Sequence, residues 1–321
     1  MQCNVLTRRM VTLGLGLGLA ATALAQSTYP SKPIRVIVPY AAGGVVDVQT
    51  RALTISMAKE LGQSIVVEAK PGANANIAAE YVARSPADGY TVLISSPFVI
   101  NNPLLESNLR WAPSDFVPVG RFSMSPSYFV VPMTSPAKTV SEYVELAKKA
   151  KPPLQYADGG QGSTQTMANE MFRHVAGIAL ESVPYKGAPP AIPDLINGMM
   201  SMAITPSSVA VPQIKAGKLR ALANINSRRS ADLPDVPTIA EAGFPEVTAV
   251  SWYGMHVPAG TPPEVMRKLE AAMKAAAATN EVKERLVNAG GEEAFLGQTE
   301  FVAFIKADAA RWEKVVKIIK K

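Results

Sequence analysis

The feature that most constrains this chain is a short apolar run at residues 34–38 that leads into a turn of small residues. Pro39 and Tyr40 open the turn, Gly43 and Gly44 follow, and a helical pattern begins near Asp47. This order predicts a buried strand, a glycine turn and a helix N-terminus, where free N–H groups favour contact with an anion. The alternative is a tight corner with Asp47 as an ordinary helix cap.

A second segment repeats this order of elements. A predicted strand at 154–157 leads into a polar turn, and a helix is expected from Ser163 to about residue 175. The turn and the helix start contain Gly160, Gln161, Gly162, Ser163 and Thr164. The two hydroxyls either donate to an anion or cap the helix. Two such turns favour two domains that present them to opposite sides of one cleft.

The remaining pattern alternates short apolar runs with helical periods, which predicts an α/β fold with largely parallel strands. One helix places Leu53, Met57 and Leu61 on one face and ends at Gly62. Another runs to about residue 84, with an asparagine at 74 or 76 as its cap. Of the 321 residues, roughly 295 would remain after removal of the expected export signal described below, and this length favours two domains.

The N-terminus reads as an export signal, residues 1–25. Arg8 and Arg9 precede an apolar core that is shorter than the roughly 20 residues of a membrane span, and a small-x-small site ends at Ala25. The paired arginines raise the twin-arginine route, although we expect the general secretory route. The chain's one cysteine, Cys3, would be lost with the signal, so no disulfide or thiol nucleophile is expected.

Charge and motif content argue against several function classes. The net charge of +6 falls to +4 without Arg8 and Arg9, and no basic run suggests nucleic acid. The two histidines, His174 and His256, lack metal-ligand spacing, and there is no G-x-S-x-G motif. We therefore expect no catalytic residue, metal or cofactor, while an exported hydrolase with Ser163 as nucleophile stays an alternative.

Many separate motifs, in order over the mature length, give the chain a family resemblance. It resembles the Bug-type solute receptors, the periplasmic binding components of tripartite tricarboxylate transport systems. The motifs are Tyr29-Pro30-Ser31-Lys32-Pro33-Ile34-Arg35, Pro39-Tyr40-Ala41-Ala42-Gly43-Gly44 with Asp47, Glu68-Ala69-Lys70-Pro71-Gly72-Ala73, Ala87-Asp88-Gly89-Tyr90-Thr91, Val183-Pro184-Tyr185-Lys186-Gly187, Ile214-Lys215-Ala216-Gly217-Lys218-Leu219-Arg220-Ala221-Leu222, Leu233-Pro234-Asp235-Val236-Pro237-Thr238-Ile239 and Trp252-Tyr253-Gly254.

The resemblance implies a two-domain fold of the type II periplasmic-binding-protein class that closes like a hinge around one ligand. We expect one domain at residues 26–125 plus 250–321 and the other at 126–249. In such receptors backbone N–H groups and water from two loops hold a carboxylate. The implied ligand residues here are Tyr40, Gly43, Gly44, Val45, Ser95, Ser96, Gly160, Gln161, Gly162, Ser163, Thr164, Thr205 and Tyr253, with the tyrosines packing the ligand body and Ser95, Ser96 and Thr205 tuning selectivity.

Two positions depart from the family pattern. Thr166 stands where a histidine is common, and Thr205-Pro206-Ser207 stands where a strand often ends in an aspartate. The second change weakens the case for an amino-acid ligand and favours a plain or aromatic carboxylate.

The expected function is therefore capture of a mono-, di- or tricarboxylate in the periplasm. A monomer would deliver it to the membrane subunits of the transporter, and a carboxylate sensor for a signalling partner is a further alternative.

Overall fold

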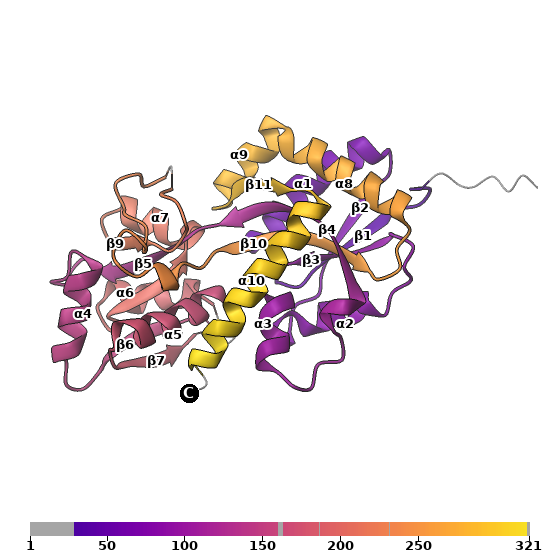
Figure 1. The fold of residues 1–321 in the computed structure, drawn as a ribbon. Coiled ribbons are helices and arrows are strands. Elements are labelled where there is room, and N and C mark those ends of the chain that lie inside the picture. Colours follow the sequence, from indigo (N-terminus) through magenta and orange to yellow (C-terminus); the bar gives the residue numbers. More distant parts are fainter. Residues whose placement is uncertain (1–28, 160–162, 186, 231, 320–321) are drawn as a thin grey trace, which may run out of the picture.

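The computed structural model describes residues 29–159, 163–185, 187–230 and 232–319, and these form two mixed sheets side by side (Figure 1). The expected signal peptide and Gly160, Gln161 and Gly162 lie outside the described residues.

The first sheet has six strands in the order β11-β4-β10-β3-β1-β2. The strands β1, β2 and β3 are parallel, whereas β10 runs antiparallel to β3 and β4, and β11 antiparallel to β4. In β1, Ile34, Val36, Ile37 and Val38 are all buried, as expected of a parallel strand covered on both faces. The bounds are β1 Ile34–Val38, β2 Ile65–Ala69, β3 Thr91–Ser95, β4 Phe116–Ser125, β10 Ser251–Pro258 and β11 Glu292–Leu296.

The second sheet has five strands in the order β7-β6-β8-β5-β9. Its arrangement repeats that of the first, because β6, β7 and β8 are parallel and β5 runs antiparallel to β8 and β9. The bounds are β5 Ser127–Pro132, β6 Leu154–Asp158, β7 Leu180–Pro184, β8 Met202–Pro206 and β9 Leu219–Asn224.

Helices cover both sheets, and the last one, α10, crosses from the first domain to the second, where it packs on α5 (Figure 1). Trp312 and Val316 of α10 are buried in the apolar core. The bounds are α1 Val45–Leu61, α2 Asn76–Ala83, α3 Phe98–Leu105, α4 Val140–Lys149, α5 Thr164–Ala176, α6 Ile192–Ile196, α7 Ser207–Lys215, α8 Pro263–Ala278, α9 Asn280–Asn288 and α10 Gln298–Ile319.

Two local predictions are wrong. The strands are not largely parallel, because β5 and β10, which follow the two passages of the chain between the sheets, pair antiparallel with both neighbours. Nor does an asparagine cap α2: the cap residue is Ala75, and the Asn76 side chain accepts hydrogen bonds from Asn102 and Trp111.

The chain passes between the sheets at two places. Strand β4 ends at Ser125 and β5 begins at Ser127, while β10 returns to the first sheet at Ser251. Strands of the first sheet thus come from residues 34–125 and 251–296, and those of the second from 127–224. The exact domain boundaries stay a prediction, which this division supports.

A third contact ties the two domains together beside these passages. The carbonyl oxygen of Gly290, between α9 and β11, accepts hydrogen bonds from Ser125 Oγ and Ser207 Oγ, each at 2.7 Å. Ser207 is the first residue of α7, in the second domain. We call the contact of Gly290 with Ser125, Ser207 and Ser208 the Gly290 latch.

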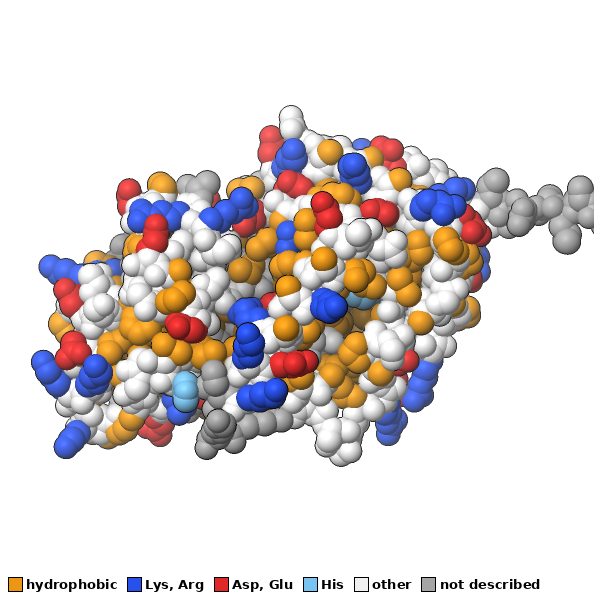
Figure 2. All heavy atoms as spheres, in the orientation of Figure 1, with side chains coloured by type: hydrophobic (Ala, Val, Ile, Leu, Met, Phe, Trp, Pro, Cys, Tyr) orange, Lys and Arg blue, Asp and Glu red, His pale blue; other side chains and the backbone are white. Residues whose placement is uncertain are grey.

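Charges of both signs are scattered over the face that Figure 2 shows, with no broad patch of one sign. Among the described residues, no helix combines the length and the apolar character that a membrane span requires.

Candidate functional site

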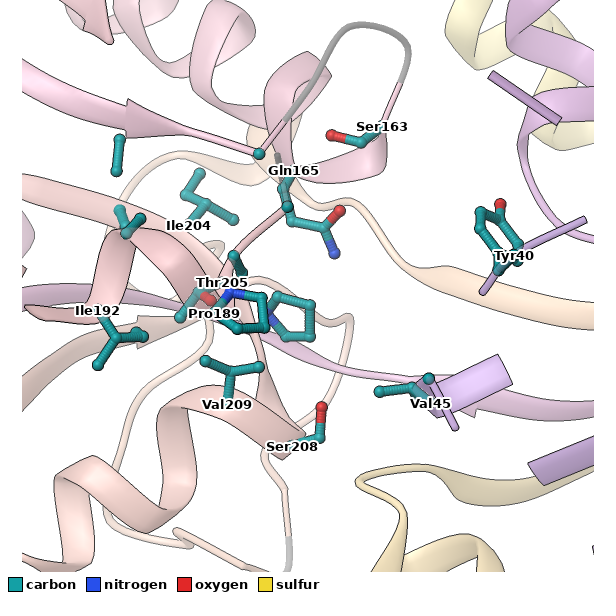
Figure 3. Close-up of a pocket in the computed structure, with 18 of the residues that line it drawn as sticks. Tyr40, Val45, Ser163, Gln165, Pro189, Ile192, Ile204, Thr205, Ser208 and Val209 are labelled. Atoms are coloured by element: carbon teal, nitrogen blue, oxygen red, sulfur yellow. The ribbon is translucent and has the colours of Figure 1, made fainter. Parts of the chain in front are cut away.

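A cavity of about 630 Å³ lies between the two domains. One continuous segment of the first domain forms one wall, and Figure 3 shows Tyr40 and Val45 facing residues of the second domain across the open space. Several separate segments form the opposite wall. The described lining residues are Tyr40, Ala41, Gly43, Gly44, Val45 and Val46 on one side, and Ala157, Gly159, Ser163, Gln165, Gly187, Ala188, Pro189, Ala191, Ile192, Leu195, Ala203, Ile204, Thr205, Pro206, Ser208 and Val209 on the other.

The glycine turn of the first wall satisfies part of its own hydrogen bonding. The N–H of Gly43 donates to Asp47 Oδ2 at 2.9 Å, and the N–H of Gly44 donates to the Ala41 carbonyl at 3.2 Å. Gly43 has a φ of +77°, a conformation that favours glycine. The donors left to a ligand are therefore those of the first turn of α1, at Val45 and Val46, which have no acceptor within the helix.

Asp47 organises this turn from the third position of α1. Its buried carboxylate accepts from Arg51 Nε at 2.9 Å and Nη2 at 3.0 Å, besides the Gly43 N–H. Burial opposes ionisation, but the hydrogen bonds from Arg51 and Gly43 outweigh it and lower the pKa of Asp47. The carboxylate is thus charged and paired, and the cap residue of α1 is Gly44.

Tyr40 is held at the edge of the cavity by its neighbours. Its hydroxyl lies 2.6 Å from Ser96 Oγ, and Tyr253 is buried in the same apolar cluster against which Tyr40 packs. Burial raises the pKa of Tyr40 and also that of Tyr253, so both phenols are neutral. Ser95, by contrast, lies 2.7 Å from Nδ1 of the buried His256, whose pKa burial lowers to about 3.

In the second wall, Ser163 caps α5. Its Oγ accepts from the Thr166 N–H at 3.1 Å, which confirms that the hydroxyl acts as a helix cap. The first turn of α5, at Thr164 and Gln165, leaves N–H groups without helical partners. Thr166 Oγ1 donates to Asp158, the last residue of β6.

Gln165 links this wall to both passages between the domains. Its amide Nε2 donates to Ser127 Oγ at 2.9 Å and lies 3.3 Å from Ser251 Oγ. Ser127 begins β5 and Ser251 begins β10, so one side chain of the cavity contacts both segments that join the domains.

The rest of the second wall is mostly aliphatic, with two hydroxyls. Ile192, Leu195 and Ile204 are buried, and Val209 is half-buried in the first turn of α7. Thr205 Oγ1, at the end of β8, and Ser208 Oγ, in α7, are buried without a hydrogen-bond partner. Both residues line the cavity and are labelled in Figure 3.

Among the described lining residues, backbone dipoles are the source of the electrostatic potential. No Lys, Arg, His, Asp or Glu is among the described residues that line it, yet the N-terminal turns of α1, α5 and α7 all contribute lining residues. Each helix N-terminus carries a partial positive charge and unpaired N–H donors. The cavity is therefore suited to an anion with an apolar body.

Groups for catalysis or metal binding do not gather here. His174 is exposed on α5 and His256 is buried among aromatic rings of the first domain, so neither assists Ser163. In the described parts of the chain, no three His, Cys, Asp or Glu side chains cluster as a metal site.

The structure brings six of the predicted residues to one cavity: Tyr40, Gly43, Gly44, Val45, Ser163 and Thr205. Ser95, Ser96, Thr164 and Tyr253 are buried beside it or behind it without lining it, and Gly160, Gln161 and Gly162 lie outside the described residues. Sequence reasoning missed Gln165, Ser208 and the aliphatic residues of α6 and α7. The Tyr185-Lys186-Gly187 motif, which comes shortly before α6, was the available signal for the α6 residues.

Comparisons with known proteins identify the family of the chain. Residues 49–320 match the family model described as tripartite tricarboxylate transporter family receptor. The chain is 32% identical over 317 residues to the protein BugT of Bordetella pertussis, covering 97% of each.

Solved structures of similar sequence share the fold. The periplasmic binding protein BugD is 31% identical, with a TM-score of 0.79 and coverage of 91% of this chain and 99% of that one. R. palustris Rpa4515 with adipate is 32% identical (TM-score 0.81, coverage 91% and 98%). MatC of Rhodopseudomonas palustris with bound malate is 30% identical (TM-score 0.77, coverage 90% and 100%).

The two-sheet architecture, the cavity between the domains and these matches lead to one conclusion: the chain belongs to the tripartite tricarboxylate transporter receptor family of periplasmic solute-binding proteins, with a two-domain fold of the type II class.

Proposed function

We propose that this protein binds a small carboxylate in the cavity between its domains and delivers it to the membrane subunits of a tripartite transporter. The observation that carries the proposal is the set of three helix N-termini around a cavity whose described lining is uncharged. A carboxylate would accept from the N–H groups of Val45 and Val46 on one side and of Thr164 and Gln165 on the other. The relatives that hold adipate and malate support the same ligand class.

We propose further that the ligand closes the domains. Binding favours closure when the bound molecule contacts both walls in the closed state and only one in the open state. The cavity walls come from different domains, and Gln165 and the Gly290 latch lie at the passages about which the domains would rotate. Tyr40, backed by Ser96 and Tyr253, would then pack on the ligand body.

The cellular setting belongs to the same proposal. Residues 1–25 direct export by the general secretory route and are removed after Ala25, and the mature chain acts as a monomer in the periplasm. The apolar aliphatic wall favours a ligand with a hydrocarbon body between or beside its carboxylates.

Thermal unfolding tests the proposal. The mature protein is unfolded, dialysed and refolded to remove any bound ligand, then melted with adipate, malate, benzoate or the matching amides. A carboxylate at about 100 times its dissociation constant stabilises the fold by roughly 2.7 kcal/mol. The Tm of the protein should therefore rise with the carboxylate and stay unchanged with the matching amide. If no carboxylate raises the Tm of the refolded protein, the proposed function is wrong.

A further inference from the structure

The second wall contains two polar groups that the fold itself leaves without partners. Thr205 is 1% exposed, and neither its Oγ1 nor Ser208 Oγ has a hydrogen-bond partner. A buried hydroxyl without a partner costs free energy, and folding normally pairs it. Two such hydroxyls lie on one wall of a cavity and close together in sequence. This arrangement suggests that a bound molecule supplies their missing hydrogen-bond partners.

A buried hydroxyl also stands alone elsewhere in this protein, and the contrast is informative. Thr50 Oγ1 in α1 is buried without a partner, but Thr50 does not line the cavity. Thr205 and Ser208 do line it, in a wall most of whose other described side chains are aliphatic and carry no hydrogen-bonding group. Their position, not the missing bond alone, distinguishes them.

The backbone around these hydroxyls adds the same polarity. Ser208 is the second residue of the nine-residue helix α7. The Ser207 N–H already donates to the Pro126 carbonyl at 2.9 Å, so the N–H groups of Ser208 and Val209, together with the helix dipole, favour a negative group here. The Gly290 latch fixes this end of the helix, because Ser207 Oγ donates to the Gly290 carbonyl and the two backbones pack closely. They are so close that a Cβ added at Gly290 would lie only 2.6 Å from Ser208 Cα and Ser208 N. The close packing holds the Ser208 side chain at the cavity wall.

We propose that Thr205 Oγ1 and Ser208 Oγ, with the first turn of α7, form a subsite for the second carboxylate of a dicarboxylate ligand. This inference rests on the proposed function, in which the first carboxylate lies at α1 and α5. The second carboxylate accepts from the two hydroxyls, and the hydrocarbon between the carboxylates packs on Ile192, Ile204 and Val209. An ammonium group at the same place would lie at the positive end of α7 and find no carboxylate among the described lining residues.

The test compares ligands that differ only at the far end. Adipate, hexanoate and 6-aminohexanoate share one carboxylate and one chain length, and the set is repeated with five and seven carbons. Calorimetry on the refolded protein should give at least tenfold tighter binding for the dicarboxylate than for the monocarboxylate at the best length, since hydrogen bonds to a charged group are individually strong. The amino acid should bind more weakly than the monocarboxylate.

Variants then assign the preference to residues. Thr205→Val replaces the hydroxyl with a methyl of similar size, and Ser208→Ala removes the other. Each should cut the preference for dicarboxylate over monocarboxylate at least threefold, with monocarboxylate binding almost unchanged. Thr50→Val is the matched control, because it removes an equally buried, unpartnered hydroxyl outside the cavity, and it should leave the ratio as in the wild type.

The outcomes separate the two proposals. If no carboxylate binds, malate and benzoate included, the proposed function fails and the subsite with it. If benzoate binds but no dicarboxylate does, the subsite is wrong while carboxylate binding stands. If monocarboxylates bind as tightly as dicarboxylates, or if Thr205→Val and Ser208→Ala both leave the ratio unchanged, the subsite is wrong while carboxylate binding stands.

Discussion

The two walls of the cavity differ in how much of their chemistry is already satisfied. In the first domain, one turn supplies the wall, and Asp47 and Ala41 already accept the N–H groups of its two glycines. In the second domain, separate segments of β6, α5, α6, β8 and α7 supply the wall, and two buried hydroxyls there have no partner.

This difference assigns the walls different roles. A turn whose N–H groups are already hydrogen-bonded within the turn is rigid and offers few donors to a ligand. Such a wall suits the recognition of one feature that all the ligands would share, a carboxylate. A wall with an aliphatic surface and unpaired hydroxyls has the groups to distinguish one ligand body from another. We therefore expect affinity to depend on both walls and selectivity to depend mainly on the second.

The largest expected effect comes from a negative charge placed in either wall. Val45 and Val209 lie in the first turns of α1 and α7, where glutamate suits the helix dipole and leaves the helix intact. Val45→Glu and Val209→Glu should each weaken carboxylate binding by about 100-fold, or ~2.7 kcal/mol, through repulsion of like charges. Isothermal titration calorimetry measures it.

The controls are Val45→Gln and Val209→Gln, which have the same shape without the charge and should lose less than tenfold. Full affinity of Val45→Glu for carboxylates would show that the first wall is not part of the binding site.

The next effect concerns the pH dependence of stability, which should originate in the first domain. Burial lowers the pKa of His256 to about 3. Below pH 6.5 the unfolded chain therefore binds a proton at this histidine, whereas the folded chain binds it only near pH 3. The free energy of unfolding should therefore fall by up to about 1.4 kcal/mol per pH unit as pH drops from 6.5 to 4.5. The carboxyls of Asp47 and Glu68, whose pKa values are lowered, lose their stabilising effect only at lower pH.

Urea unfolding at a series of pH values measures this slope. His256→Gln, which has no titration in this range, should flatten it. A wild-type stability that stays constant from pH 6.5 to 4.5 would show that His256 is protonated in the fold.

A smaller effect is expected at the Gly290 latch. Gly290→Ala brings a Cβ against the Ser208 backbone and should displace α7. We expect the binding of every carboxylate to weaken by about tenfold, with the order of their affinities unchanged. Gly217→Ala is the matched control, because Gly217 has a similar φ of +67° against +69° and no atom near its Cβ position. Calorimetry and small-angle scattering give affinity and domain separation. If the two substitutions have equal effects, the loss at Gly290 comes from backbone strain, and the contact with Ser208 contributes nothing to binding.

The smallest effect concerns the Tyr40 hydroxyl. Tyr40→Phe and Ser96→Ala each remove the 2.6 Å hydrogen bond and should weaken binding by about fivefold, near 1 kcal/mol, because the ring loses its orientation. The double variant should lose no more than either single one, since both changes break the same bond. Additive losses in calorimetry would mean that Tyr40 and Ser96 contact the ligand independently.

Local patterns in the sequence predicted much of the framework. The strand, glycine turn and helix at residues 34–61, the cap at Ser163 and the glycine at the end of α1 are all short-range features, set by periodicity and backbone conformation. The resemblance then linked two distant turns, and six of the thirteen predicted site residues line one cavity.

Features that depend on distant contacts were beyond sequence patterns. The antiparallel pairing of β5 and β10 follows from how the chain passes between domains, and Gln165 gains its role only because Ser127 and Ser251 meet beside it. The hydrogen bonds that Gly43 and Gly44 make within their own turn depend on its three-dimensional geometry, which the sequence pattern does not give. The same is true of the missing hydrogen-bond partners of the Thr205 and Ser208 hydroxyls.

Carboxylate binding between the two domains is tested most directly by a crystal structure of the refolded protein with the carboxylate that raises its Tm most. We expect electron density for the ligand between the domains, with one carboxylate within hydrogen-bond distance of the N–H groups of Val45 or Val46 and of the first turn of α5. Ligand density outside this cavity, or a carboxylate held by charged side chains without those N–H groups, would contradict this expectation.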